Sequence, residues 1–333
     1  MSRAARLTAR WTRLSLDNAP LARSSHGLSS IGGAAYLFGG EATARTAIDS
    51  VVHRLDLQAG AWTELQPSGS AAPLPRIGHA QCAASGQLIV FGGRTSVSMG
   101  EGDLNDLWSF DPEAVAWTPL EAASGEPPSA RSFHRAAAVG DRVYVFGGCD
   151  ASGRRADLHE FDLSSRRWTE LAPPADLGGY PGRGGATLEA AADGSALLAV
   201  AGFAGHETND VVRFDVARRV WERAPSEWLR PRSVCASFSF APVSGPAVVV
   251  FGGEVSPSDK GHEGAGGFAS DLVGIDAGGQ PIEVVVDGAS TPPPRGWGAG
   301  TAIAADQGVL FGGLSGDDAA PVRLGDAWHL EVA

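Results

Sequence analysis

The sequence is poor in cysteine and tyrosine, and it contains no long apolar run. Three cysteines occur in 333 residues, at positions 82, 149 and 235, and they are too few to form a disulfide framework. We therefore expect free thiols and a reducing, cytoplasmic location. No apolar stretch is long enough to cross a membrane, and residues 1–16 lack the apolar core of a signal peptide.

Positive charge is also scarce. The chain carries 26 Lys and Arg residues against 38 Asp and Glu residues, so its formal net charge is −12. Because such a chain repels phosphate groups, neither nucleic acid nor an anionic membrane is an expected partner. No long stretch of the sequence has apolar residues repeating with the period of an α-helix. Its 45 glycines and 21 prolines instead favour short strands joined by tight turns.

An apolar run that ends in Gly-Gly recurs along the chain. The pairs begin at Gly39, Gly92, Gly147, Gly252 and Gly312. A weaker copy, Ala201-Gly202-Phe203, fills the gap in the series, and successive copies lie about 50 to 60 residues apart. A period near 50 residues is typical of a kelch-type β-propeller, in which each repeat builds one four-stranded blade. The repeats predict an all-β protein with six blades.

The repeats also carry a tryptophan downstream of each glycine pair. It is present in four of them, as Trp62, Trp117, Trp168 and Trp221. The fifth repeat has Ile282 and Val284 instead, and the sixth stops before its tryptophan is due. Residues 9–14, which include Trp11, are similar to residues 61–65. We therefore predict that the N-terminal strand completes the last blade and pairs edges that would otherwise be open.

The six repeats and the closing N-terminal strand predict a single domain over residues 1–333. Its blades are expected at about 21–66, 74–121, 129–172, 181–224, 230–287, and 294–333 together with 9–16.

Each repeat also has an arginine near the start of its first strand. These are Arg23, Arg76, Arg131, Arg183, Arg232 and Arg295. Because hairpin strands run antiparallel, the arginines are expected at the same mouth of the central channel as the Gly-Gly turns. Two hypotheses remain open: the side chains bridge neighbouring blades and bind backbone carbonyls, or some of them bind an anionic ligand. His26, His79 and His134 follow the first three arginines and are expected to pack between blades.

The loop after Gly253 is the richest in potential ligands. Glu254, Asp259 and His262 lie within nine residues of one another, among glycines and a proline that let the loop fold back. Two carboxylates and one imidazole suit Fe(II), Mn(II) or Zn(II) and leave positions open for a substrate. The alternative is a solvated loop whose acids cap turns.

Several segments match one known group of proteins. They include residues 22–26, 38–41, 91–94, 105–107, 131–134, 144–149, 182–185, 202–205, 251–254, 261–266 and 294–297. The chain resembles the plant kelch proteins called specifier proteins, which comprise the nitrile-specifier, epithiospecifier and thiocyanate-forming proteins. The most particular matches are Gly202-Phe203-Ala204-Gly205 and the loop from Glu254 to Gly266.

This resemblance implies an Fe(II)-dependent, lyase-like enzyme. Specifier proteins act on the thiohydroximate-O-sulfate that a thioglucosidase releases from glucosinolates, and they divert it to products such as nitriles. Their iron motif is Glu-x-x-x-Asp-x-x-x-His. Glu254 and His262 match its outer positions, while Ser258 stands at the middle one and Asp259 is expected to substitute for the missing acid. The family's sulfate-binding, catalytic arginines correspond to Arg94 and Arg154.

The implied partners are an anionic small-molecule substrate and a thioglucosidase. Near the same mouth, Phe133 and Trp297 are expected chiefly to pack the blades. The competing hypothesis is a non-catalytic kelch module that uses the same loops to hold a protein, since fold alone does not choose between these uses. Galactose-oxidase-like copper chemistry is excluded because only three tyrosines are present, and a metal-free sugar mutarotase is a more distant alternative.

Overall fold

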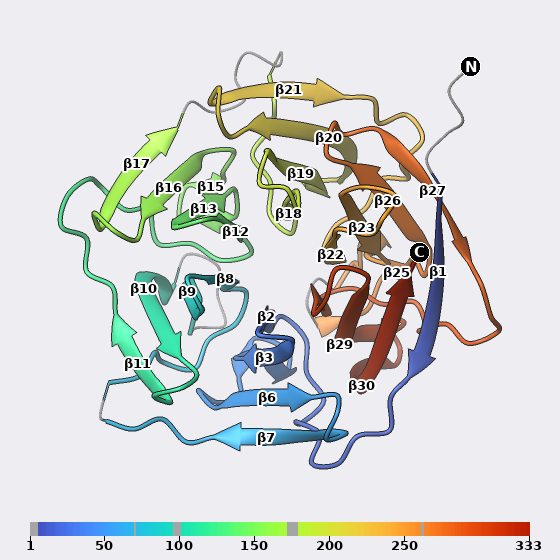
Figure 1. Cartoon of the computed structure of the whole chain (residues 1–333), viewed down its shortest axis with the longest axis horizontal. Helices are drawn as coiled ribbons and strands as arrows, with labels where there is room; N and C mark the ends of the chain where they lie inside the picture. The colour runs from blue at the N-terminus through green and yellow to red at the C-terminus, as the bar shows by residue number, and fades with distance from the viewer. Residues whose placement is uncertain (1–5, 70, 96–100, 172–178, 261–262) are drawn as a thin grey trace.

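The computed structural model describes residues 6–69, 71–95, 101–171, 179–260 and 263–333. The regular elements are strands arranged around a central axis (Figure 1), which confirms the predicted all-β kelch propeller. The described strands group into four separate four-stranded sheets and one eight-stranded sheet made of two such halves. We call these four-stranded units blades 1 to 6 in chain order. The structure contains, in the part of the chain that it describes, no apolar helix of membrane-spanning length.

Every blade is built in the same order from the axis outward. Blade 1 contains β2 (Gly27–Ile31), β3 (Ala34–Phe38), β6 (Val52–Asp56) and β7 (Ala61–Leu65). Blade 2 contains β8 (Ala80–Ala84), β9 (Gln87–Arg94), β10 (Asp103–Asp111) and β11 (Ala116–Pro119). Blade 3 contains β12 (Arg135–Val139), β13 (Arg142–Phe146), β16 (Leu158–Asp162) and β17 (Arg167–Leu171).

The second half of the ring repeats this order. Blade 4 contains β18 (Thr187–Ala190), β19 (Ala196–Phe203), β20 (Glu207–Asp215) and β21 (Val220–Ala224). Blade 5 contains β22 (Ala236–Phe240), β23 (Ala247–Phe251), β26 (Leu272–Asp276) and β27 (Pro281–Val286). Blade 6 contains β28 (Ala299–Ala302), β29 (Gln307–Gly316), β30 (Pro321–Val332) and β1 (Arg6–Arg13).

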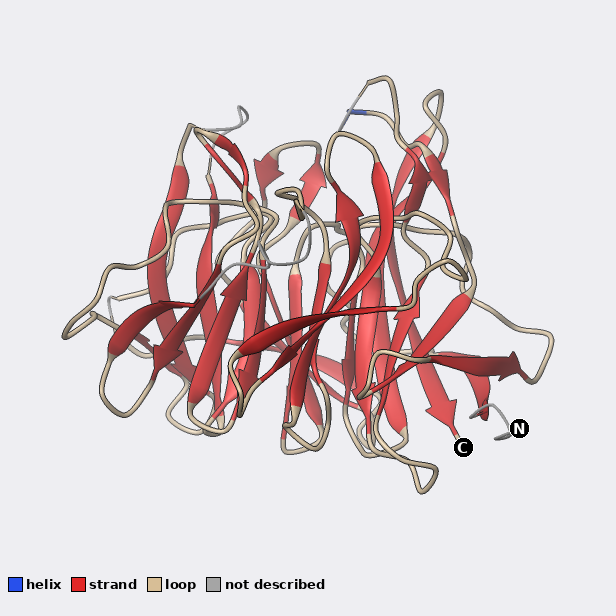
Figure 2. Cartoon of the chain, turned by 90° about the horizontal axis from the view of Figure 1, so that it is seen from above, coloured by secondary structure: helices blue, strands red, loops and turns tan. Residues whose placement is uncertain are grey.

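Short hairpins extend some blades beyond their Gly-Gly turns. They pair β4 (Glu41–Thr43) with β5 (Thr46–Ala47), β14 (Cys149–Asp150) with β15 (Gly153–Arg154), and β24 (Glu254–Ser256) with β25 (Gly267–Phe268). In blade 6, β29 and β30 remain paired past the turn, as far as Gly316 and Pro321. Seen edge-on, longer hairpins rise from one side of the disc (Figure 2). We call the side that carries these turns the Gly-Gly face.

The N-terminal strand closes the ring as predicted. Strand β1 pairs antiparallel with β30, so that Trp11 lies opposite Leu330, and it also pairs parallel with β27 of blade 5. Because β1 is hydrogen-bonded on both sides, blades 5 and 6 share one sheet, and the first strand of the chain leaves neither outer edge open at this junction.

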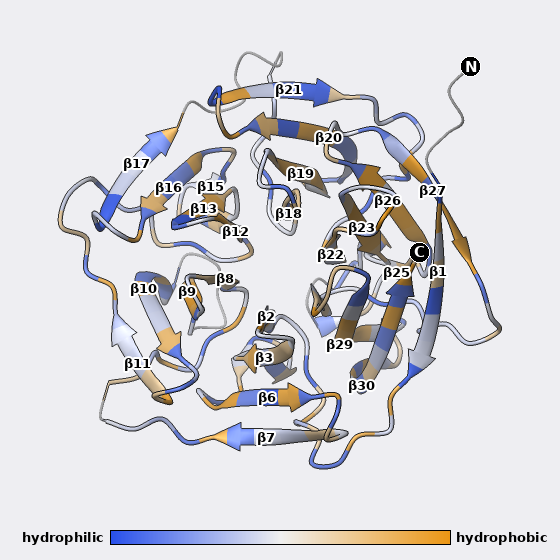
Figure 3. Cartoon of the chain, in the orientation of Figure 1, coloured by the Kyte–Doolittle hydropathy of each residue, from blue (hydrophilic) through white to orange (hydrophobic). Residues whose placement is uncertain are grey.

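The core lies between the blades. Each outer strand except β27 carries a tryptophan, which packs against the phenylalanine that precedes the Gly-Gly turn of the blade before it. These ring pairs are Trp62–Phe311, Trp117–Phe38, Trp168–Phe91, Trp221–Phe146 and Trp11–Phe251, with ring centroids 5.0 to 5.5 Å apart. The hydrophobic second strands, such as β3 and β23, are buried along their whole length (Figure 3). Burial of these aromatic pairs makes each blade depend on its neighbour.

Both residues of the Gly-Gly turn have left-handed backbone dihedral angles. The first has φ between +60° and +67°, and the second between +92° and +111°. A Cβ on Gly40 would come 2.8 Å from the backbone oxygen of Ser24, so glycine is required there. In blade 4, Ala201 takes the first position with φ +55°, and Gly202 keeps the second. At Gly202, φ is +118°, a backbone conformation that residues with a side chain rarely adopt.

The six repeat arginines are almost completely buried, at 0 to 1% exposed. In Arg131, Nε donates to the carbonyl of Ser129, Nη1 to the carbonyl of Gly147, and both terminal nitrogens to Asp157 at 2.7 and 2.8 Å. Asp106, Asp271 and Asp326 accept hydrogen bonds from both terminal nitrogens of their arginines in the same way. Arg183 contacts Asp210 through Nη1 alone, and its Nη2 has no hydrogen-bond partner among the described residues, while Arg23 lies 3.5 Å from Asp49. These side chains therefore hold strands together within their own blade. Their carboxylate and carbonyl partners favour the structural hypothesis over the binding of an anion.

The backbone of the same arginines joins one blade to the next. In every blade the carbonyl of the arginine accepts a hydrogen bond from the second residue of the preceding Gly-Gly turn, at 2.8 to 3.0 Å. The bond from Gly313 to Arg23 closes this circle between blades 6 and 1. The predicted bridging of blades is thus made by the main chain, not by the guanidinium groups.

A second circle of backbone hydrogen bonds surrounds the axis. It runs through the residue two positions after each arginine: Ser25, Gly78, Phe133, Gly185, Val234 and Trp297. All six have φ between +50° and +61°, and each N–H donates to the carbonyl of the previous blade at 2.6 to 3.1 Å. We call this closed circle the axial ring. It narrows the channel to a backbone collar at the Gly-Gly face.

The three histidines pack between blades, as expected. His26, His79 and His134 are at most 4% exposed, and each ring meets a phenylalanine of the preceding blade edge-on. Burial lowers the pKa of His26 and His134 to about 3, so they are neutral packing groups at physiological pH.

The arginine staples predict a graded loss of stability. D157N should lower the free energy of unfolding at pH 7 by about 3 kcal/mol, because it leaves the buried Arg131 without its charge partner. D49N, at the longer Arg23 contact, should cost about 1 kcal/mol or less. Chemical denaturation of wild type, D157N and D49N measures this difference. Equal losses of unfolding free energy in the two variants would contradict the stabilising role of the Arg131–Asp157 pair.

The same variant has a defined pH dependence. Burial raises the pKa of Asp157, but hydrogen bonds from Arg131 and His159 outweigh it and hold that pKa well below its usual range. The stabilisation is therefore present above the ordinary carboxyl pKa and disappears as the pH falls below it, so the gap between wild type and D157N should narrow in acid.

Candidate functional site

The residue directly after each Gly-Gly turn lies at the Gly-Gly face beside the axial ring. Each of these residues forms a β-bridge with the residue that follows the repeat arginine, which fixes its backbone next to the collar. In chain order they are Glu41, Arg94, Cys149, Phe203, Glu254 and Leu314. The position is therefore structurally equivalent in all blades, while its chemistry differs in each. We call this set the rim.

Arg94 is the buried cation of the rim. Its side chain is 2% exposed, and the guanidinium lies over the ring of Phe133 at 5.0 Å from the centroid. Its Nε and Nη2 atoms have no hydrogen-bond partner among the described residues. Burial lowers the pKa of Arg94, and the charges of Glu41 and Asp103 partly offset this. A buried guanidinium with unused donors can receive an anion.

Arg154 comes from the hairpin of blade 3 and is exposed. Its guanidinium lies 4.7 Å from the ring centroid of Phe203. Cys149, its partner across the hairpin, is buried, which raises the pKa of the thiol, while Arg154 and Arg94 both act to lower it. The thiol thus lies within the fields of both predicted arginines, and the two line the same side of the mouth.

The opposite side of the mouth is acidic. Glu254 is 6% exposed, and its pKa is raised to about 7 by burial and by the charges of Glu207 and Asp318. Glu207 is itself buried, which raises its pKa, and it accepts a hydrogen bond from Ser233 Oγ at 3.1 Å. Arg94 and Arg154 thus lie on blades 2 and 3, and these acids lie on blades 4, 5 and 6. The charges are not fully segregated, because Glu41 of blade 1 acts on Arg94 and Arg323 lies on blade 6.

The structure describes two of the three predicted metal ligands, Glu254 and Asp259. Glu254 faces the mouth, but Asp259 is exposed, and Ser258 is the residue whose hydroxyl donates to Asp318. His262 lies outside the described residues. Within them, no group of three or more His, Cys, Asp or Glu side chains is placed to hold one metal ion. The triad therefore remains a prediction.

Glu41 contacts Arg323, and no sequence motif predicted this contact. Glu41 is 2% exposed, accepts hydrogen bonds from Ser24 and Ser25, and lies 3.8 Å from Nη2 of Arg323. Arg323 keeps Nε and Nη2 without hydrogen-bond partners in the described part of the chain. Glu41 follows its glycine pair directly, as Arg94 and Glu254 do. This shared position in the repeat is the sequence feature that could have marked Glu41 as a rim residue.

Comparison with protein families agrees with this architecture. Residues 25–253 match the model of the KLHDC2/KLHL20/DRC7 kelch-repeats domain, which is more than half of the chain. The chain belongs to the kelch-repeat family.

The individual relatives include a protein named as an enzyme and proteins that are not named as enzymes. The chain is 28% identical over 316 residues to the N-(sulfonatooxy)prop-2-enimidothioate sulfolyase of Thlaspi arvense, covering 88% of both chains. It is 33% identical over 218 residues to the human Rab9 effector protein with kelch motifs, covering 61% of this chain and 55% of that protein. Human kelch domain-containing protein 3 is 32% identical over 173 residues, or 48% of this chain and 44% of that protein. The predicted resemblance to the specifier type is thus supported over nearly the whole chain.

The acidic side of the mouth predicts a pH-dependent effect of E254Q. Because the pKa of Glu254 rises from the ordinary 4.5 to about 7 on folding, the stability of the wild type falls as the pH rises through this interval. E254Q should therefore be more stable than wild type by roughly 2 kcal/mol at pH 8 and equal to it near pH 4. Thermal or chemical unfolding at both pH values measures this, with the exposed E113Q as the neutral control. Equal stabilities of E254Q and wild type at pH 8 would contradict the raised pKa of Glu254.

Proposed function

We propose that the chain is a sulfolyase-like lyase that binds an anionic, sulfonatooxy-bearing small molecule at the Gly-Gly face. The observation that carries this proposal is the buried Arg94, whose Nε and Nη2 lack partners in the described residues. The relative in Thlaspi arvense, whose name specifies a sulfonatooxy substrate and a sulfolyase activity, supports the choice of anion. The finer proposal is a thiohydroximate-O-sulfate, such as a glucosinolate aglucone, converted to a nitrile.

Arg94 would act on the leaving group. When the N–O bond breaks, its electron pair leaves with the sulfate, and negative charge grows on the sulfate oxygens. The electron pair of the C–S bond forms the third C–N bond of the nitrile, and the sulfur departs as neutral sulfur. Two parallel N–H donors match two sulfate oxygens, and a site shielded from water strengthens this contact. Because Phe133 packs beneath the guanidinium, the donors are held in one orientation before the substrate arrives.

Arg154 would contribute a second, more mobile contact. It is exposed and stacks on Phe203, so it can approach a bound anion from the solvent side without the desolvation that Arg94 has already undergone. The acidic side of the mouth would repel sulfate and thus direct the anion to the arginine side.

Iron(II) at Glu254, Asp259 and His262 is part of the proposal. Glu254 fits such a role, because a buried carboxylate next to Glu207 and Asp318 gains from a nearby cation. Asp259 is an exposed carboxylate of the same loop and would supply a second oxygen ligand. Bound iron would supply a Lewis-acidic centre for the sulfur of the substrate.

A non-catalytic interaction module is the second candidate. The identity to the human Rab9 effector protein favours it, because that relative is named for an effector role and not for an enzymatic one. A protein partner and a small anion would both bind at the Gly-Gly face. The experiments below distinguish the two functions by measuring whether the protein turns over a substrate.

The first experiment replaces Arg94. R94Q should reduce kcat/KM for release of sulfate from a sulfonatooxy imidothioate by about 100-fold, because it removes charge-assisted donors from the leaving group. The melting temperature should not fall, since the variant removes a buried charge that has unused donors. R131Q is the matched control for a structural arginine and should lower the melting temperature. Unchanged turnover in R94Q, or a wild-type protein that releases no sulfate, would contradict the proposed lyase activity.

The second experiment concerns the metal. Wild-type protein loaded with Fe(II) under anaerobic conditions should retain about one ion per chain, measured by elemental analysis after desalting. E254A and H262A should each retain less than a tenth of this amount, whereas E263A, an exposed acid of the same loop, should bind normally. Full retention of iron by both E254A and H262A would exclude the proposed ligands.

A further inference from the structure

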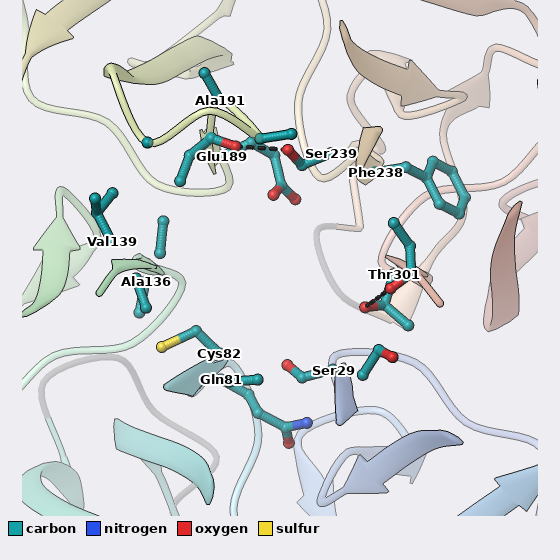
Figure 4. A pocket seen from close by; sticks show the side chains of 18 of the residues that line it. Ser29, Gln81, Cys82, Ala136, Val139, Glu189, Ala191, Phe238, Ser239 and Thr301 are labelled. Atoms are coloured by element: carbon teal, nitrogen blue, oxygen red, sulfur yellow. Dashed lines mark hydrogen bonds between the residues drawn. The ribbon is translucent and has the colours of Figure 1, made fainter. Parts of the chain in front are cut away.

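The central channel contains a second cavity, on the side away from the Gly-Gly face. It has a volume of about 540 Å³ and is lined by residues of all six innermost strands (Figure 4). The turns at Gly140 and Gly194, which join the first two strands of blades 3 and 4, also border it. Because these turns lie at the opposite ends of the strands from the Gly-Gly turns, the cavity belongs to the other face of the disc.

The axial ring separates this cavity from the rim. All six residues of the ring border a gap of only about 20 Å³, which has room for about one water molecule. The innermost strands continue from this gap and line the larger cavity. A molecule larger than water therefore reaches the cavity from the far face of the disc.

The charged side chains that line the cavity are both acids. Glu189 lies on β18, the innermost strand of blade 4, and Asp193 lies in the turn that follows it. Among the described residues of the lining there is no lysine, arginine or histidine. Asp193 is exposed at this turn, and hydrogen bonds from Ser195 lower its pKa, so it carries its charge at the opening. The cavity thus presents two carboxylates and no base.

Glu189 keeps one carboxylate oxygen for a ligand. Its Oε1 accepts a hydrogen bond from Ser237 Oγ at 2.6 Å, and the other oxygen has no hydrogen-bond partner in the described part of the chain. Burial raises the pKa of Glu189 to about 7, although Ser237 and Arg135 oppose the shift. Arg135 acts from the small gap under the ring and does not line the large cavity. A cation in the cavity therefore meets Glu189 without displacing a partner.

The neutral polar groups of the wall favour a hydrogen-bond donor. Ser239 Oγ donates to the carbonyl of Ala190 at 2.6 Å, and Thr301 Oγ1 donates to the carbonyl of Ala302 at 3.5 Å (Figure 4). Because a hydroxyl has a single hydrogen, both oxygens are left to act as acceptors. The thiol of Cys82 is neutral, since burial raises its pKa to about 12. An ammonium group has three donors and no acceptor, so it matches this wall, whereas an anion does not.

We infer that the channel is a binding site for a small aliphatic amine, with one ammonium group at Glu189 and, in a diamine, the second near Asp193. The site is separate from the rim and does not depend on the proposed lyase activity. A volume of about 540 Å³ lies within the range of small-molecule pockets, and alanines of three innermost strands supply methyl groups for the carbon chain. The formal net charge of −12 attracts such cations to the protein.

The test uses 1,4-diaminobutane and butylamine as probes. Isothermal titration at pH 8 should detect binding of both to wild-type protein, with the diamine bound more tightly. Butyrate and 1-butanol, which lack the ammonium group, should bind at least tenfold more weakly. E189Q preserves shape and removes the inner charge, so it should weaken both amines at least tenfold. D193N should weaken the diamine more than butylamine, because butylamine has no second ammonium group.

The affinity should also depend on pH. Glu189 gains its charge as the pH rises through about 7, while the amine and Asp193 remain charged. Wild-type protein should therefore bind butylamine about tenfold more tightly at pH 8 than at pH 6, and E189Q should show no such rise.

D306N is the matched control for general attraction of cations. Asp306 is an exposed acid in the corresponding turn of blade 6, between β28 and β29, and it does not line the cavity. D306N should leave both affinities unchanged. R94Q, which alters the rim, should also leave them unchanged, and this separates failure of the amine site from failure of the proposed function. Absence of amine binding to wild-type protein, wild-type affinity in E189Q, or an equal loss in D306N would overturn the inference.

Discussion

The closed circles of backbone hydrogen bonds between blades are the constraint on which the rest of the structure depends. Each blade contributes one bond to the axial ring and one to the circle of arginine carbonyls. Forming the axial ring requires a left-handed φ in every blade, including at Val234 and Trp297, where such a conformation is costly. The cost is tolerated because an opened ring would leave buried N–H and C=O groups without partners.

The circles also determine what remains available for function. The repeat arginines contact carboxylates and carbonyls of their own blades and so stabilise the fold, while the proposed anion site depends on a different residue, Arg94. The rim is the position left to vary, because its backbone is fixed by a β-bridge and its side chain faces the mouth. One position can therefore hold a buried arginine in blade 2 and a buried glutamate in blade 5 without changing the blade.

The axial ring gives the disc two chemically distinct sides. At the Gly-Gly face, Arg94 and Glu254 create a mouth with opposite charges on opposite sides. On the other side, the ring forms the floor of the channel that contains Glu189.

The sequence by itself determined the propeller, because the Gly-Gly period and the aromatic positions are local features of each repeat. Even the closure by Trp11 was predictable from its similarity to the segment around Trp62. Only the tertiary structure decided the roles of the arginines, since their carboxylate partners lie 26 to 39 residues away on another strand. It likewise placed Glu207 and Asp318 beside Glu254, because residues of three blades meet at the mouth only when the ring is closed.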